Sequence, residues 1–256
     1  MSVLLREFIH RALNEAGQAS ERQEYGLINS INATASQEHP VEVKSSNEDI
    51  PNVVAASKVD GMSSLGKEPY TDIRLHLSNG HTLNISAKGN AAPSLAGGGL
   101  VALNRLLPDL VKRFLEAAVA RLQEEGFVDG EQNVPDVYGK ISFYDAMTIL
   151  AGDLAMGGPI DYMYQGPMDV TAEYCNDRQE CSVTVNGAFT NIEDYAMSHV
   201  LYLRARKRRI DQPFDATGVD LAGLPSIYGK SPSKGDRNRR IVITDKVPAS
   251  AIVVEI

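Results

Sequence analysis

The hydrophobic positions along the chain change from helical spacing near the N-terminus to strand alternation soon after it. Apolar side chains recur every three to four residues over 3–16 and again over 20–35, and this spacing predicts two helices. Pro108 is predicted to open a fresh helix inside a longer helical pattern. Further helices are predicted over 100–126, 141–154 and 192–198. Strands are predicted over 41–44, 53–59, 168–174, 181–185, 200–209 and 240–244, and a hairpin over 71–88. This order predicts an α/β or α+β fold with N-terminal helices, a mixed sheet, a long following helix and a strand-rich C-terminal half.

The register of the hairpin predicted over 71–88 follows from its own apolar pattern. A two-residue turn at Asn79-Gly80 would set an apolar residue against a polar one at every position. A three-residue loop with Gly80 in the left-handed conformation instead pairs Ile73 with Ile85. One face of the hairpin is then wholly apolar, so we predict the three-residue loop.

The opposite face of this hairpin collects polar residues at one end. It carries Asp72 across from Ser86, with Lys88 two residues further along the same side. A carboxylate, a hydroxyl and an ammonium group that converge can hold a hard divalent cation and neutralise charge on a phosphoryl oxygen. The alternative is that these residues are the ordinary polar side chains on the wet face of a half-buried hairpin.

One carboxylate lies on the apolar face of the second predicted helix. The apolar stripe of that helix consists of Tyr25, Leu27, Ile28 and Ile31. Glu24 falls in line with it, at the four- and seven-residue spacing of one helical face. A charged residue is out of place there unless it has a specific role.

With Glu24 on a helix, Asp72 at the start of one strand and Ser86-Ala87-Lys88 at the end of the next, the chain resembles the PD-(D/E)XK nuclease superfamily. The resemblance implies a restriction-endonuclease-like core and hydrolysis of DNA phosphodiester bonds with Mg²⁺ or Mn²⁺. It implies that Asp72 and Glu24 bind the ion and that Lys88 acts on water or on the scissile phosphate.

The resemblance covers roughly residues 20–125 and departs from the family pattern at two positions. Pro69 is not adjacent to Asp72, and Ser86 replaces the acidic residue of (D/E)-x-K. Some restriction enzymes of the superfamily use S-x-K and recover a carboxylate from the next helix, but the acidic residues of that region lie far along this chain. Either Glu24 compensates for the serine, or the site has kept its fold and lost its chemistry.

Other stretches look similar to uncharacterised proteins of tailed bacteriophages of the T4-like kind. They are EPYTDIRL, ISAKG, APSLAGGGL and LYLRARKRR. This similarity implies either a phage nuclease that acts on DNA, or a virion protein of the head, neck or baseplate with a degenerate nuclease-like fold and no catalysis. The partners would be DNA or other virion subunits, with an oligomer allowed, and the location would be the host cytoplasm or the virion.

Two groups of basic residues suit contacts with phosphates. The first consists of Arg204, Arg206, Lys207, Arg208 and Arg209. The second consists of Lys234, Arg237, Arg239 and Arg240. The alternative for the first group is a strand edge protected by charge. The net charge of −8 opposes nonspecific attraction to DNA over the whole surface.

The length and composition allow one large domain or two small ones. The chain has 256 residues, 43% of them hydrophobic, so it can bury a sizeable core. We expect a nuclease-like core over 1–128 and a C-terminal part over 129–256, packed on the core or forming a second small domain. No cofactor-binding motif is recognised.

The cysteines and the N-terminus add two expectations. Cys175 and Cys181 flank a turn-like segment and could face each other across a hairpin, but free thiols are the expected state. Arg6, His10 and Arg11 interrupt the apolar residues near the N-terminus, so neither a signal peptide nor a membrane span is expected there.

Overall fold

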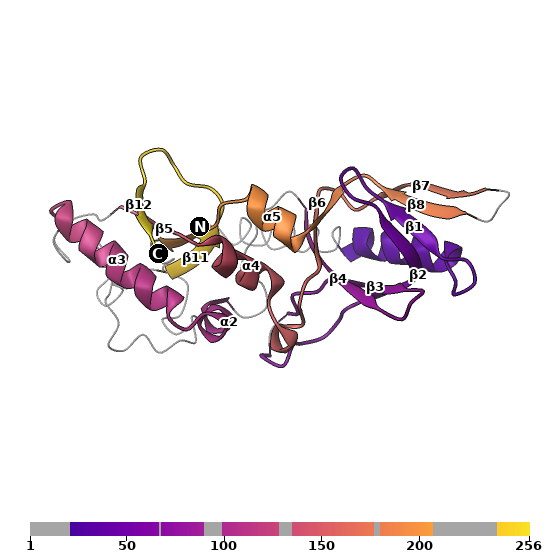
Figure 1. The fold of residues 1–256 in the computed structure, drawn as a ribbon, viewed down its shortest axis with the longest axis horizontal. Helices are drawn as coiled ribbons and strands as arrows, with labels where there is room; N and C mark the ends of the chain where they lie inside the picture. Colours follow the sequence, from indigo (N-terminus) through magenta and orange to yellow (C-terminus); the bar gives the residue numbers. More distant parts are fainter. Residues whose placement is uncertain (1–20, 67, 90–98, 128–134, 177–179, 207–239) are drawn as a thin grey trace, which may run out of the picture. The chain divides into compact units, whose positions relative to one another are not determined.

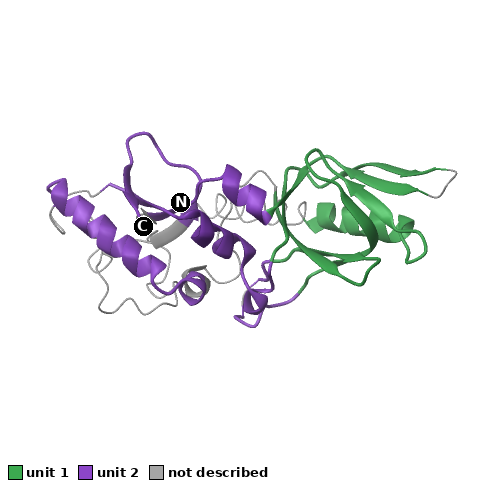
Figure 2. Cartoon of the chain, viewed as in Figure 1, with its two compact units in different colours: residues 1–60, 71–91, 160–191 green, residues 61–70, 92–159, 192–256 purple. Residues whose placement is uncertain are grey.

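A computed structural model describes residues 21–66, 68–89, 99–127, 135–176, 180–206 and 240–256. The chain forms two compact units that interleave along the sequence (Figure 2). Unit 1 consists of residues 1–60, 71–91 and 160–191, and unit 2 consists of residues 61–70, 92–159 and 192–256. The sequence suggests one boundary near residue 128, whereas residues 160–191 pack with the N-terminal residues in unit 1. The helix predicted over 3–16 lies outside the described residues.

Unit 1 contains an eight-stranded mixed sheet with the order β7-β8-β1-β2-β3-β4-β6-β9 (Figure 1). Its strands are β1 (Val41–Lys44), β2 (Ile50–Lys58), β3 (Ile73–Leu77), β4 (Thr82–Gly89), β6 (Tyr162–Gln165), β7 (Val170–Cys175), β8 (Cys181–Val185) and β9 (Ala188–Asn191). The pairs β1–β8 and β4–β6 are parallel, and the other neighbours are antiparallel. This arrangement confirms the mixed α/β class.

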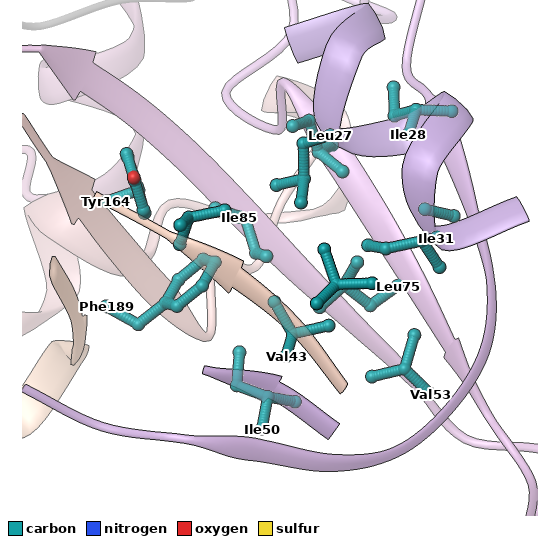
Figure 3. Packing of buried hydrophobic residues seen from close by; sticks show 14 of the residues in the cluster. Leu27, Ile28, Ile31, Val43, Ile50, Val53, Leu75, Ile85, Tyr164 and Phe189 are labelled. Atoms are coloured by element: carbon teal, nitrogen blue, oxygen red, sulfur yellow. The ribbon is translucent and has the colours of Figure 1, made fainter. Parts of the chain in front are cut away.

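One helix, described over residues 21–34, covers the apolar side of this sheet. Figure 3 shows Leu27 and Ile31 of the helix on the side of Leu75 of the hairpin, and Ile28 belongs to the same buried cluster. Burial of each such side chain stabilises the fold by about 1.5–3 kcal/mol. This packing holds the helix on strands β2 to β4.

Two neighbouring residues near the start of the helix have different environments. Tyr25 is 40% exposed, so it lies off the buried face, contrary to the predicted stripe. Glu24 is buried, as its alignment with the apolar residues indicates. The helix therefore carries a carboxylate to the sheet.

The hairpin of β3 and β4 has the predicted register. Ile73 pairs with Ile85 and Leu75 pairs with Leu83. The Leu77 N–H donates to the His81 carbonyl oxygen at 2.9 Å, which closes a three-residue loop. The loop ends at Gly80, whose φ is +82°. A residue with a side chain would be strained in this conformation, which explains the glycine.

Unit 2 combines a four-stranded sheet with helices. The strand order is β11-β10-β5-β12. Its strands are β5 (Val137–Lys140), β10 (Tyr202–Arg206), β11 (Arg240–Thr244) and β12 (Ile252–Glu255). Its helices are α2 (Gly99–Leu106), α3 (Leu110–Glu124), α4 (Phe143–Ala151), the 3₁₀ helix η1 (Leu154–Met156) and α5 (Ile192–Ser198). The interruption between α2 and α3 confirms the break predicted at Pro108.

The expectation of free thiols is wrong. Cys175 and Cys181 form a disulfide, with their Cα atoms 4.1 Å apart. They are directly opposite each other in the β7–β8 hairpin, because the antiparallel register pairs Cys175 with Cys181. Close cross-strand pairing brings the two sulfur atoms within bonding range.

No helix in the described part of the chain combines the length and the apolar composition needed to cross a membrane.

Candidate functional site

Charged side chains from four elements of unit 1 interact at one end of its sheet. Glu24 comes from the helix, Lys58 is the last residue of β2, Asp72 precedes β3, and Ser86 and Lys88 lie near the end of β4. The structure thus brings together the four residues predicted to be catalytic, Glu24, Asp72, Ser86 and Lys88, and adds Lys58. Their chemical roles stay predictions.

Asp72 is fixed between its two neighbouring strands. Its Oδ2 atom accepts the Ala87 N–H at 2.6 Å and the Ser86 hydroxyl at 3.3 Å. Its backbone N–H donates to the Ile85 carbonyl at 2.9 Å, and its carbonyl accepts the Val59 N–H at 3.1 Å. The carboxylate therefore has a defined position before any ligand binds.

The electrostatic environment of Asp72 links it to the other charged residues. Burial raises the pKa of its carboxyl above the usual value and outweighs the opposing effects of the Lys88 charge and the Ala87 N–H. Glu24 also acts to raise this pKa, and Lys58 acts to lower it. Asp72 thus interacts electrostatically with Glu24 and with both lysines.

Glu24 forms an ion pair with Lys58, whose ammonium group donates to Oε2. Burial acts to lower the pKa of Lys58, but the Glu24 carboxylate, together with Asp72 and Asp60, outweighs it and raises this pKa. The pair is well shielded, since the side chains of Lys58 and Glu24 are only 16% and 9% exposed. Water therefore screens this attraction weakly.

Lys58 was not among the sequence-predicted site residues, because a shift in the strand register hides the face on which it lies. The pairing of β2 with β3 shifts between Val53 and Ala55, after which Lys58 pairs with the buried Ile73. Strict alternation from Val53 would put Lys58 on the other face of the sheet. The sequence does not reveal the shift, so it gives no signal that Lys58 pairs with Glu24.

Of the basic residues predicted to contact phosphates, Arg204 has partners within the protein. Arg204 donates from Nε and Nη2 to Asp136 Oδ2, at 3.0 and 2.5 Å, and its guanidinium carbon lies 5.4 Å from the ring centre of Tyr138. This arginine is engaged within unit 2. Arg206 ends β10, and its side chain is not described. The predicted residues Lys207, Arg208 and Arg209 lie outside the described residues, as do Lys234, Arg237 and Arg239.

The donor set of the site limits the kind of metal ion that fits. Within the described ranges, no three His, Cys, Asp or Glu side chains are grouped so that they could hold an ion. Asp72 and Glu24 supply two carboxylates, and Ser86 supplies a hydroxyl. Mg²⁺ is commonly held by one or two carboxylates plus water and substrate phosphate. The site therefore fits an ion that shares its ligands with a phosphate, not an ion enclosed by protein ligands.

Comparisons with known proteins add little to this geometry. No protein-family model matches the chain, and no curated protein matches it. Among solved structures, the chain is similar to the restriction endonuclease MspI in complex with its cognate DNA. The identity is 15%, the match covers 75% of this chain and 71% of that chain, and the TM-score is 0.27. A TM-score this low carries no argument about shared function, so the class defined by the structure is a mixed α/β protein.

Proposed function

We propose that this chain is a nuclease that hydrolyses DNA phosphodiester bonds with Mg²⁺ or Mn²⁺. The observation that carries the proposal is the environment of Asp72. Its carboxylate is oriented by Ala87 and Ser86, and its pKa responds to the charges of Lys88 and Glu24. An oriented carboxyl with a perturbed pKa and charged neighbours from other elements is typical of catalytic sites.

Each residue has a role that its surroundings support. Asp72 and Glu24 would hold the ion, which when bound polarises the phosphoryl oxygen and lowers the pKa of water. Lys88 has no hydrogen-bond partner among the described residues, so its ammonium group is available to orient water or to neutralise a phosphate oxygen. Ser86 is only 2% exposed and orients Asp72 through its hydroxyl.

A second candidate function is nucleic-acid or subunit binding without catalysis, as in a virion protein with a degenerate nuclease-like fold. One observation favours it: the carboxylate of Glu24 is already paired with Lys58. Ser86 in turn offers no charge where the superfamily has an acidic residue. Such a site would bind phosphates weakly and would not cut them.

A cleavage assay with matched variants separates the two functions. Purified protein is incubated with duplex and single-stranded DNA in Mg²⁺ or Mn²⁺, and product formation is followed on gels. Asp72→Asn and Lys88→Met should lower the rate by about a hundredfold or more. The control is Glu42→Gln on β1, whose carboxylate pairs with the half-exposed Lys44, and its rate should equal that of the wild type.

The opposite result is equally clear. If the wild-type chain binds duplex and single-stranded DNA but cuts neither of them with Mg²⁺ or Mn²⁺, the catalytic role is wrong and the binding role replaces it. If Asp72→Asn retains cleavage, the site is wrong.

A further inference from the structure

We propose that Lys58 is an internal cation that competes with the divalent ion for Glu24. The ion would bind fully only when the ammonium group of Lys58 leaves this carboxylate. This inference rests on the proposed function, since the ion is the one assigned there to Asp72 and Glu24. It adds a residue that sets the strength of metal binding.

The fold directs Lys58 to Glu24. Lys58 is opposite Ile73 in the antiparallel β2–β3 pair, and cross-strand partners share one face of a sheet. Ile73 belongs to the buried core that the helix covers, so the Lys58 side chain starts on that covered side. Glu24 lies one helical turn before Leu27 and Ile28, which pack on the same core. The ion pair therefore follows from the packing of helix on sheet.

Lys58 contacts an oxygen atom of the kind that a divalent ion takes as a ligand. Lys58 donates to Glu24 Oε2, and hard divalent ions take carboxylate oxygens as ligands. Two cations at one carboxylate repel each other strongly in a poorly hydrated setting. Either the ammonium group moves away or the ion binds weakly.

An alternative partner for the displaced ammonium group lies nearby. Asp60 follows Lys58 by two residues, and its charge acts on the pKa of Lys58, as does that of Asp72. Asp60 is exposed, so its carboxylate can accept the lysine without burying a further charge. Asp60 is not a ligand in the proposed site, so pairing with it would release the Glu24 carboxylate to the ion.

The test measures binding of Mn²⁺ alone to the full chain by calorimetry, without DNA. Lys58→Met should raise the affinity for Mn²⁺ about tenfold or more, because the competing charge is removed. In a Glu24→Gln background the same substitution should change the affinity less than about twofold, because the shared carboxylate is absent. Lys44→Met on β1 is the control and should leave the affinity unchanged.

Two results would overturn the inference. The first is an equal gain of affinity from Lys58→Met with and without the Glu24 carboxylate, which would show a long-range charge effect. The second is no gain at all, including the case in which neither protein binds Mn²⁺. If Lys58→Met does not fold, Lys58→Gln keeps a donor for Glu24 without the charge and replaces it in both backgrounds.

The failure of the proposed function would look different. A wild-type chain that cuts no DNA, but whose affinity for Mn²⁺ rises on Lys58→Met only when Glu24 is present, refutes the nuclease and supports the competition. A chain that cuts DNA and shows no change in Mn²⁺ affinity refutes the competition and supports the nuclease.

Discussion

The carboxylate of Asp72 is held in place at a cost to the stability of the fold. Two donors orient its Oδ2 atom, yet burial raises its pKa, so the ionised form is less favourable in the folded chain than in water. Alanine at this position would leave the Ala87 N–H and the Ser86 hydroxyl without their acceptor, which costs about 1–3 kcal/mol. Asparagine keeps an acceptor and removes the charge. It is therefore the better probe of function.

The pH dependence of stability tests this account of Asp72. A raised folded-state pKa means that its stabilising contribution is complete below the unfolded value of about 3.9. The contribution is lost as the pH rises through the folded-state pKa. The free energy of unfolding of Asp72→Asn, relative to the wild type, should therefore increase between pH 4 and pH 7. Urea denaturation in EDTA at several pH values measures this difference, and a difference that shrinks with rising pH would contradict it.

At the scale of elements, the hairpin loop should depend on the conformation of one glycine. Gly80 has a φ of +82° and open space around the position of a Cβ atom, so an alanine there is strained by its backbone alone. Gly80→Ala should lower the free energy of unfolding by about 1–2 kcal/mol. The measurement is urea denaturation followed by circular dichroism.

Gly26 provides a matched control for this substitution. It lies in the helix at 21–34, and a Cβ atom there also meets nothing within 4 Å. Gly26→Ala should raise the free energy of unfolding by about 0.5–1 kcal/mol, because alanine is the better helix former. Equal effects of the two substitutions would show that backbone conformation does not decide the outcome.

The elements that the sequence predicts well are those set by local pattern. The hairpin register follows from residues within one short segment, and the helix that carries Glu24 follows from apolar spacing. Strands β5, β6, β9 and β12 were not predicted. Each has four residues, and β6 pairs with β4 across a long separation in sequence, so no local signal marks it.

Part of the candidate site could likewise be predicted from local pattern, and part could not. Asp72 and Ser86 come together through the local hairpin, which the sequence resolves. Lys58 reaches Glu24 only after the register shift in β2 and the packing of the helix on the sheet, and both are tertiary effects. The disulfide between Cys175 and Cys181 was missed for another reason. The general scarcity of disulfides outside oxidising compartments outweighed a hairpin geometry that was visible in the sequence.

At the scale of the whole molecule, the N-terminal half should not fold alone. The core of unit 1 includes Tyr164, Val183 and Phe189, which belong to strands β6, β8 and β9. A fragment of residues 1–128 lacks all three strands and exposes the faces that they cover. It should show no cooperative thermal unfolding and no cleavage of DNA, whereas the full chain should unfold cooperatively. Circular dichroism melts test this, and a sharp transition in the fragment would support the boundary suggested by the sequence.

The two parallel pairings of unit 1 also affect the chain while it is being made. Strand β1 needs β8, and β4 needs β6, so two edges of the early sheet stay open until the later strands emerge from the ribosome. At typical synthesis rates of about 5–20 residues per second, the wait lasts roughly 4–15 s from the end of β4 to the end of β6, and roughly 7–28 s from the end of β1 to the end of β8. Open strand edges are templates for pairing with other chains. The yield of folded protein in a cell will therefore depend on what shields β1 and β4 during synthesis.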